Sequence, residues 1–396
     1  MSTEEIVILS SVRTAVGSFG GSLKDKTAPE LGILVAQEAI KRSNVQPENF
    51  DEVIFGHGWQ AGVGPNSARL ISVQSGISEN VPAFTVNKRC GSSLKTIALA
   101  AQSIRAGDSN IVLAGGVEST SNVPYVQKDT RWGAKIGHAK FIDLIYQDGY
   151  MDPLSGQLMG CTAENLVEKY NISREEQDEF ALESQKKATN AIESGLFEDE
   201  IIPVELKNRK GEVKSFCKDE TPRYDISLEK LGRLRPVFEK EGSVTAGNSC
   251  CQGDAGSATV VSSRERAKEL GLKPLASILG YASAGVDPKL MGLGPVKAIP
   301  MALKKANLKL DDMDLIEVNE AFAAQVIACE RELKWDRSKL NVRGGAIALG
   351  HPVGATGGKI LSTCMNALEN IGKEHAVVSA CIGGGQGIAL VIKRIG

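Results

Sequence analysis

A short strand passes directly into a helix in the stretch VPAFTVNKRCGSSLKTIALAAQSIRAGD, residues Val81–Asp108. The helix is rich in small residues and is predicted to end at Gly107. A second strand, NIVLAGGVES, follows at once over Asn110–Ser119 and stops after a double glycine. Upstream, Glu5–Val16 reads as a buried strand, and Ala28–Ser43 has helical apolar spacing after Thr27, a plausible N-cap. Alternating strands and helices predict a layered α/β unit.

The last third of the chain repeats this pattern. A strand passes into a helix at Asn319 as it does at Cys90, and AVVSACIGGG from Ala376 resembles NIVLAGGVES from Asn110. From Asn122 to about Gly242 the chain is more polar, with charged helices such as Ser173–Gly195. We therefore predict two copies of one α/β unit around an inserted loop subdomain. The predicted parts are an N-terminal half (1–121), a loop subdomain that returns to the N-terminal half (122–248) and a C-terminal half (249–396).

Composition excludes several classes of protein. The 396 residues include 46 Lys and Arg against 48 Asp and Glu, a balance that argues against a dedicated nucleic-acid binder or a polybasic membrane protein. No apolar run approaches the roughly 18–20 residues that span a bilayer. The first residues carry acids where a signal peptide needs bases, so a cytoplasmic location is expected. The eight cysteines are scattered without CxxC spacing, so neither a disulfide framework nor a metal site is expected.

Cys90 stands between a strand and the start of a helix. Free N–H groups and the positive end of the helix dipole stabilise a thiolate there, and Lys88 and Arg89 add positive charge. Small residues follow it and leave room for a substrate. The local sequence alone leaves two alternatives for Cys90, a nucleophile or an inert buried cysteine, which is the commonest fate of a free thiol.

A cysteine nucleophile needs a base, and the chain has only four histidines. His351 lies among glycines that permit close approach of a ligand; His57, also between glycines, is its rival. Cys381 precedes a triple glycine whose N–H groups suit an oxyanion, or it is simply a packed strand-end cysteine. Asn319 lies at a strand-to-helix turn, where an ordinary N-cap is the alternative.

Longer motifs give these residues a context. The chain resembles the thiolases, the acyl-CoA acetyltransferase branch of their superfamily, from end to end. The resemblance rests on NKRCGSSLK (87–95), AGGVESTSNVPY (114–125), MGCTAEN (159–165), DETPR (219–223), LRPVFEKEGSVTAGN (234–248), MGLGPV (291–296), NEAFAAQ (319–325), GGAIALGHPVGATG (344–357) and CIGGGQG (381–387). A single glycine run would be weak, but this set in family order is specific.

The resemblance implies a mechanism. Cys90 becomes acylated, His351 activates it and faces the thioester oxygen, and Cys381 is a second acid and base. Asn319 holds a water that forms one oxyanion hole with His351, and the N–H groups of Cys90 and Gly383 form another. The implied fold has two βαβαβαββ halves in five layers with a loop domain. Coenzyme A is the implied acyl carrier, without a metal or redox cofactor. The enzyme is expected to be a homodimer or homotetramer, and some divergent members work with a small accessory protein.

Some positions depart from the usual family pattern. Cys250 replaces a serine that commonly helps to bind the coenzyme A arm, and Leu158 stands where a histidine is frequent. Arg89 precedes the nucleophile in place of a small apolar residue, and Arg343 lies in NVRGG. These changes suggest an altered acyl group that is carboxylated, aromatic or branched, with Arg89 or Arg343 meeting a carboxylate. Neutral drift, with both arginines at the surface or paired to structural acids, is the alternative.

Other positions match binding residues of the family. Arg223 and Ser227 match positions near the nucleotide end of coenzyme A, unless they belong to a solvated loop. Met159, Met291 and Phe322 match apolar pocket positions, unless they are plain core.

The predicted activity is thiolytic cleavage of a 3-oxoacyl-CoA through acyl-Cys90, or the reverse Claisen condensation. The alternatives are an ordinary acetoacetyl-CoA thiolase, a decarboxylating condensing enzyme, in which a Cys-x-Gly-Gly-Gly run is not expected, and a catalytically silent acyl-CoA-binding subunit of a larger complex.

Overall fold

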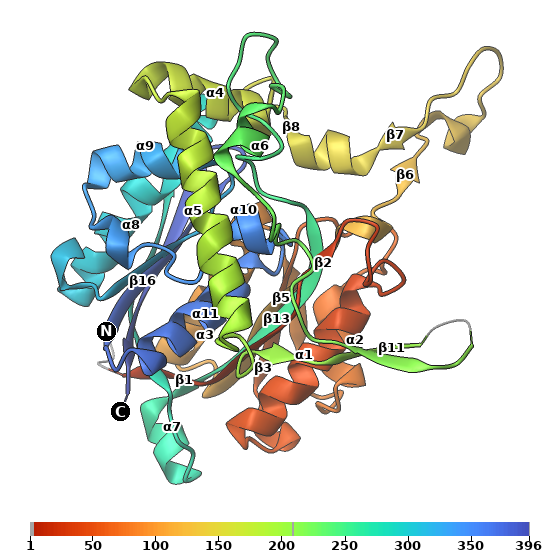
Figure 1. Cartoon of the computed structure of the whole chain (residues 1–396). Helices are drawn as coiled ribbons and strands as arrows, with labels where there is room; N and C mark the ends of the chain where they lie inside the picture. Colours follow the sequence, from red (N-terminus) through yellow and green to blue (C-terminus); the bar gives the residue numbers. More distant parts are fainter. Residues whose placement is uncertain (1–3, 208–209, 396) are drawn as a thin grey trace.

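A single large sheet organises the molecule. The computed structural model describes residues 4–207 and 210–395. Its 11-stranded sheet has the order β15-β16-β17-β14-β1-β13-β5-β3-β4, with β10 beside β1 and β2 beside β13 (Figure 1). The strands are β1 (Ile6–Thr14), β2 (Gly17–Ser18), β3 (Glu52–His57), β4 (Ala83–Val86), β5 (Ile111–Ser119), β10 (Ile201–Ile202), β13 (Gly253–Ser263), β14 (Ala276–Gly285), β15 (Leu315–Val318), β16 (His375–Ile382) and β17 (Gln386–Arg394).

Strand pairing confirms the predicted duplication. In the N-terminal half, β13 is antiparallel to β1 and β5, and β3 is parallel to β5 and β4. In the C-terminal half, β17 is antiparallel to β14 and β16, and β15 is parallel to β16. A parallel bridge between Ile316 and Leu340 occupies the place of the β3–β4 pairing. The halves join where Val7 and Ile8 of β1 pair with Ser277 and Ala276 of β14.

One strand crosses a predicted boundary. The residues of β13 were assigned to the C-terminal half, which was expected to start at residue 249. In the structure β13 lies between β1 and β5 of the N-terminal half. Every residue of β13 is buried, because the strand lies inside the sheet with a partner on each side. Its place in the sheet therefore does not match its place in the sequence. The division of the chain into three parts stays a prediction.

Helices cover both faces of each half of the sheet. The outer helices are α1 (Ala28–Ser43) and α2 (Ser67–Gln74) on the N-terminal half, and α8 (Gly294–Ala306) and α9 (Ala323–Leu333) on the C-terminal half. Between the halves, α3 (Ser92–Ala106) packs against α11 (Thr356–Asn370) (Figure 1). Successive side chains of a strand point to opposite faces of the sheet. In β1, Ile6 and Ile8 belong to the cluster around α3 and α11, whereas Val7 and Leu9 face α1. Across the molecule the layers therefore run helices, one half of the sheet, helices, the other half of the sheet, helices.

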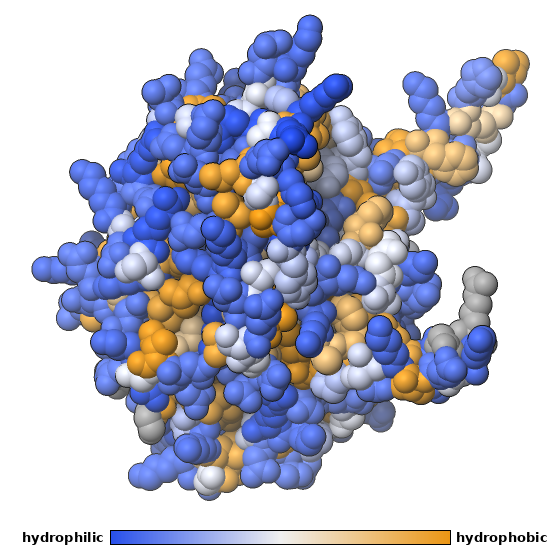
Figure 2. All heavy atoms as spheres, in the orientation of Figure 1, coloured by the Kyte–Doolittle hydropathy of each residue, from blue (hydrophilic) through white to orange (hydrophobic). Residues whose placement is uncertain are grey.

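The middle of the chain forms the loop region. It holds α4 (Met159–Tyr170), α5 (Arg174–Glu193), α6 (Leu228–Gly232) and three small hairpins: β6 (Tyr125–Val126) with β7 (Ile142–Asp143), β8 (Met151–Asp152) with β9 (Gln157–Leu158), and β11 (Val204–Lys207) with β12 (Val213–Phe216). The segment around β6 and β7 projects as an arm with apolar side chains at its tip (Figures 1 and 2). The remaining α-helices of the described residues are the short α7 (Arg264–Glu269) and α10 (Ala346–Leu349), and a π-helix spans Tyr146–Tyr150.

Candidate active site

A cavity of about 770 Å³ opens where the two halves and the loop region meet. Four of the five predicted catalytic residues line it. Cys90 comes from a 3₁₀ turn, η2 (Arg89–Gly91), in front of α3, and His351 from the loop between α10 and α11. Cys381 comes from the end of β16, and Gly383 from the turn that follows. Residues separated by almost 300 positions in the sequence therefore share one cavity.

The turn at Cys90 is held tightly in place. Arg89 has a φ of 49°, in the left-handed region that few side-chain-bearing residues adopt. Ser92 fixes the turn, since its hydroxyl donates to the Arg89 carbonyl at 2.7 Å and accepts from the Lys88 N–H at 2.9 Å. A Cβ on Gly91 would lie 2.5 Å from Cδ1 of Ile382, so glycine is what lets this turn approach the end of β16. That approach brings the Cys90 turn next to the strand that carries Cys381.

The charge state of Cys90 differs from the expectation. Burial raises the pKa of the Cys90 thiol, and this outweighs the opposing effects of the Arg89 charge and of the N–H groups of Gly383 and Cys90. The favourable groups expected from the sequence are present, but the sequence could not weigh them against the loss of water around the sulfur. The resting thiol is therefore protonated, and it needs a base to become a nucleophile.

His351 has the properties of that base. Its Nδ1 lies 2.6 Å from Oγ1 of Thr356, and this hydroxyl donates to the Pro352 carbonyl at 2.9 Å. Because the hydroxyl has only one proton, we assign the imidazole proton to Nδ1, which leaves Nε2 as the acceptor. Nε2 is buried and has no hydrogen-bond partner in the described parts of the chain. Burial and the charges of Lys359 and Arg89 lower the pKa of His351 to about 3, so the ring is neutral at physiological pH.

Cys381 is suited to hold a proton. Burial raises its pKa well above the usual thiol value, and the nearby Cys90, Cys329 and Cys250 sulfurs act in the same direction. The group is therefore a thiol that can serve as an acid. Gly383, two residues further on, directs its N–H to the Cys90 sulfur. A Cβ at this glycine would lie 3.0 Å from Sδ of Met159, so the turn is closely packed.

Asn319 is buried just after β15. Its backbone N–H donates to the Ser379 carbonyl at 2.9 Å, which ties it to the neighbouring strand β16. Neither Oδ1 nor Nδ2 of its side chain has a hydrogen-bond partner among the described residues. The side chain does not cap α9, which begins four residues later at Ala323. A buried amide without protein partners needs a water or a ligand, so the predicted water-holding role remains consistent with its surroundings.

Most of the predicted binding residues also line the cavity. They are Leu158, Met159, Arg223, Cys250, Met291, Phe322 and Arg89. Ser227 is absent from the lining; its hydroxyl accepts from the Lys230 N–H at the start of α6. The hydroxyl therefore caps α6, and a contact of Ser227 with coenzyme A stays a prediction.

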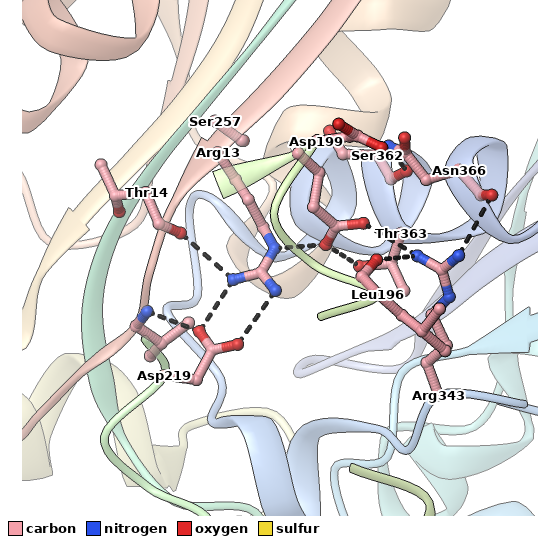
Figure 3. Close-up of polar contacts among 12 residues, drawn as sticks. Arg13, Thr14, Leu196, Asp199, Asp219, Ser257, Arg343, Ser362, Thr363 and Asn366 are labelled. Carbon is pink, nitrogen blue, oxygen red and sulfur yellow. Dashed lines mark hydrogen bonds and ion pairs between the residues drawn. The ribbon is translucent and has the colours of Figure 1, made fainter. Parts of the chain in front are cut away.

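Arg343 requires a correction, because it does not reach the cavity. It is buried under α11, where its guanidinium donates to the Leu196 carbonyl at 2.6 Å and the Asn366 carbonyl at 3.1 Å (Figure 3). Its Nη1 lies 3.6 Å from Glu200, which also pairs with Arg13. Arg343 is therefore an arginine paired to a structural acid, which was the alternative. The NVRGG motif could not show this, because it does not indicate how far the side chain lies from the pocket.

Comparison with known proteins identifies the family. The sequence matches "Thiolase, N-terminal domain" over residues 6–265 and "Thiolase, C-terminal domain" over residues 272–394. The chain belongs to the thiolase family. An acetyl-CoA acetyltransferase of Pseudomonas aeruginosa is 49% identical over 99% of this chain and 100% of its own length. A probable acetyl-CoA acyltransferase of Staphylococcus aureus is also 49% identical, over 98% and 99%. The chain is an acyltransferase enzyme.

Solved structures agree with this assignment. The acetyl-CoA acetyltransferase of Bacillus anthracis superposes with a TM-score of 0.96 at 47% identity, covering 99% of both chains. Human mitochondrial 3-ketoacyl-CoA thiolase in complex with CoA gives 0.95 at 42% identity, over 99% of this chain and 98% of that one. The thiolase fold predicted from the sequence is thereby confirmed.

His57, the rival base, has a different task in this thiolase. Its Nδ1 lies 2.8 Å from the Ser67 hydroxyl, and its Nε2 lies 3.4 Å from Oε1 of Glu118. Glu118 in turn accepts from the N–H groups of Gly58, Trp59 and Gly354. This buried carboxylate joins the loop after β3 to the loop that carries His351. Sequence reasoning missed Glu118, although a carboxylate inside an otherwise apolar strand was a signal that it has buried partners.

Other cavity residues were also missed. Trp59, Tyr146, Gly149 and Tyr150 line the wall near Arg89, and Cys251 lies beside Arg223. Trp59 and Cys251 come from loops, and Tyr146, Gly149 and Tyr150 come from a short π-helix (Tyr146–Tyr150), so no periodic spacing in the sequence connects them. Within residues 4–207 and 210–395, no group of three His, Cys, Asp or Glu side chains is arranged to hold a metal ion. In the same residues no helix is long and apolar enough to cross a membrane.

Proposed function

We propose that this thiolase cleaves a 3-oxoacyl-CoA with coenzyme A into an acyl-CoA and a shorter acyl-CoA, or catalyses the reverse condensation, through acyl-Cys90. The observation that carries the proposal is the convergence of a protonated Cys90, an unpartnered His351 Nε2, a Cys381 thiol and the Gly383 N–H in one cavity. A soft nucleophile, a neutral base, an acid and an oxyanion donor are the groups that this reaction needs.

In the first step Nε2 of His351 takes the proton from the Cys90 thiol. The thiolate attacks the keto carbon of the substrate, and the N–H groups of Cys90 and Gly383 stabilise the oxygen anion that forms. The bond between the α-carbon and the keto carbon then breaks. Its electrons form an enolate of the departing acyl-CoA, whose thioester oxygen faces His351 and the Asn319 water. Cys381 gives its proton to the α-carbon.

In the second step coenzyme A releases the acyl group. Its thiol loses a proton to Cys381 and attacks the thioester carbon of acyl-Cys90. The Cys90 sulfur leaves and takes back the proton that His351 holds, so the enzyme returns to its starting state. The condensation uses the same groups in the opposite order, which leaves the physiological direction to substrate concentrations.

Binding follows the chemistry of the lining. Apolar side chains such as Met159, Met291 and Phe322 suit the pantetheine arm and the acyl group. Arg223 and Ser227 are proposed to contact the nucleotide end of coenzyme A, which is the cosubstrate. Because Arg89, Leu158 and Cys250 all line the cavity, we also propose an acyl group other than that of acetoacetyl-CoA: carboxylated, aromatic or branched.

We also propose that the chain works as a homodimer or homotetramer, with a small accessory protein as a further partner to test. The edge strand β4 supports self-association, since it pairs only with β3 in the described residues and leaves Phe84 exposed. Ile136 on the arm is fully exposed. Analytical ultracentrifugation of the purified chain tests this, and a monomer at micromolar concentration would contradict it.

The activity is tested by intact-mass spectrometry of the protein after incubation with a panel of acyl-CoA thioesters. We expect a mass increase by one acyl group that maps to Cys90, and its removal by added coenzyme A. Cys90→Ala is the matched variant, because it keeps the cavity but has no thiol to acylate, so we expect no mass increase with any thioester of the panel. Binding of acyl-CoA without labelling of Cys90 would instead identify a silent subunit.

A further inference from the structure

The side chain of Arg89 lies in the catalytic cavity beside the nucleophile. Its guanidinium stacks on Trp59, with the central carbon 4.8 Å from the ring centroid. Its Nη2 donates to the Gly149 carbonyl at 3.0 Å. Trp59 and Gly149 line the same cavity, so these two contacts hold the guanidinium in the wall around the acyl site. A Cβ on Gly149 would lie 2.3 Å from the Trp59 ring, so this part of the wall is close-packed.

Among the residues that the structure describes, no carboxylate pairs with this guanidinium. None of the ion pairs within residues 4–207 and 210–395 includes Arg89. Two acids near the cavity are engaged elsewhere: Glu118 holds backbone N–H groups, and Glu220 binds the N–H of Ser18 and the hydroxyl of Ser22. Arg13, by contrast, is fully buried between Asp219 and Glu200 (Figure 3).

The free donors of Arg89 define what the cavity can recognise. A guanidinium has five N–H donors, of which the Gly149 carbonyl takes one. A carboxylate is the partner that matches this fork with two parallel hydrogen bonds. Much of the remaining wall is apolar, including Leu158, Val237 and Phe238, so water competes weakly once the cavity is filled.

We propose that Arg89 binds a carboxylate at the far end of the acyl chain, so that the preferred substrate is a 3-oxoacyl-CoA of the dicarboxylic type. This inference rests on the proposed function, since it assumes that the acyl group is carried by Cys90. Arg89 immediately precedes Cys90, which places the charge on the acyl side. Arg223 approaches the same cavity beside Cys251, and we assign it to coenzyme A.

The same arginine selects against neutral chains. An aliphatic acyl group in this space would displace water from the guanidinium and offer it no acceptor. Two effects therefore favour a carboxylated over a neutral acyl group. The carboxylate gains a charge-assisted hydrogen bond, and the neutral chain leaves the donors of Arg89 without a partner.

The test compares two acyl donors of similar length, succinyl-CoA and butyryl-CoA, which differ in the terminal carboxylate. The rate of Cys90 acylation is followed by intact-mass spectrometry on the purified full-length enzyme. We expect the wild type to react about 10- to 100-fold faster with succinyl-CoA, since a charge-assisted hydrogen bond has this order of effect. Equal rates, or a preference for butyryl-CoA, overturn the inference without any variant.

Arg89→Leu then separates specificity from activation of the nucleophile. We expect it to remove or reverse the preference for succinyl-CoA, while Arg89→Lys keeps part of it. Arg223→Leu is the matched control, because it should slow both donors by the same factor. If Arg89→Leu slows both donors equally, Arg89 acts only on Cys90 and the inference fails. If no donor labels Cys90 in the wild type, the proposed function itself fails.

Discussion

The two halves of the molecule share one strand order but differ in what stands at the ends of equivalent strands. In the N-terminal half, β3 ends at His57 and β5 contains Glu118 near its end. His57 contacts Ser67 and Glu118, and Glu118 accepts three backbone N–H groups. These polar side chains are occupied by the protein itself, and they hold two loops together.

In the C-terminal half the equivalent strands β15 and β16 lead to Asn319 and Cys381. Here Asn319 and Nε2 of His351 are buried without hydrogen-bond partners in the described residues. The two halves therefore share their strand order but differ in the polar side chains at the ends of equivalent strands. One half contributes the proposed nucleophile Cys90 and a set of polar groups that already have hydrogen-bond partners. The other half contributes the proposed acid and base and the buried polar atoms without partners among the described residues.

The largest effect is expected at the nucleophile. Cys90→Ser replaces the thiol with a hydroxyl of much higher pKa, which the neutral His351 cannot deprotonate efficiently. We expect thiolysis to fall by about 10³- to 10⁴-fold while the thermal midpoint stays close to the wild type. Steady-state kinetics with a 3-oxoacyl-CoA measure this. Cys250→Ser, in the same cavity, is the control, and a Cys90→Ser enzyme of undiminished rate would remove the whole mechanism.

A pair of histidine variants tests directly whether His351 is catalytic and His57 is structural. His351→Ala should lower kcat by about 10²- to 10⁴-fold, because the base is lost, with little effect on stability. His57→Asn should lower the thermal midpoint by about 2–4 °C and leave kcat within about threefold, because its contacts with Ser67 and Glu118 are structural. Calorimetry and kinetics on both proteins decide the matter. The reverse pattern would make His57 the base.

A smaller effect on activity is expected at the buried arginine. Arg343→Met leaves Glu200 with one guanidinium fewer and two carbonyls without their donor. We expect the free energy of unfolding to fall by about 3 kcal/mol, while the ratio of rates for carboxylated and neutral acyl groups stays unchanged. Denaturant unfolding and the acyl-CoA panel provide the two readouts. A changed ratio would show that Arg343 acts on the acyl group after all.

The smallest effect concerns pH. The pKa of His351 is lowered to about 3, so its base form is fully present above about pH 5 and is lost only as the pH falls toward 3. The pKa of Cys381 is raised well above the usual thiol value, so its acid form persists through neutral pH. We therefore expect kcat/KM to be flat between about pH 5 and 8 for substrates without a titrating group. An inflection near 6.5 would indicate a histidine with an ordinary pKa.

Regular elements were largely predictable because their signals are local. The helix Ala28–Ser43 has its bounds as expected, with Thr27 and Glu30 forming a capping box at its start. Gly107 ends α3 in the left-handed conformation that glycine favours. The strand expected directly before Cys90 ends earlier, since β4 covers only Ala83–Val86 and a 3₁₀ turn then carries Cys90. The sequence did not predict that Arg89 adopts a positive φ.

The site was predictable only as a set of residues. Family motifs predicted Cys90, His351 and Cys381 but not their protonation states, because burial shifts the pKa of each group. The raised pKa of Cys90 depends on walls contributed by several distant segments. Likewise Arg89 and Arg343 looked alike in the sequence. One lies in the cavity and the other beneath α11, and only packing distinguishes them.

The position of β1 also has a consequence for how the protein is made. This strand is translated before the other described strands, yet its neighbours in the sheet are residues of β10, β13 and β14, the earliest of which is Ile201. At about 5–20 residues per second, synthesis from β1 to the end of β13 takes roughly 12–50 s. During that interval α1 is available to cover one face of the strand, but its long sheet partner β13 is incomplete. Among the described strands, the first one therefore gains sheet partners only from Ile201 onward, and binding of chaperones to Ile6–Thr14 during translation is the expected result.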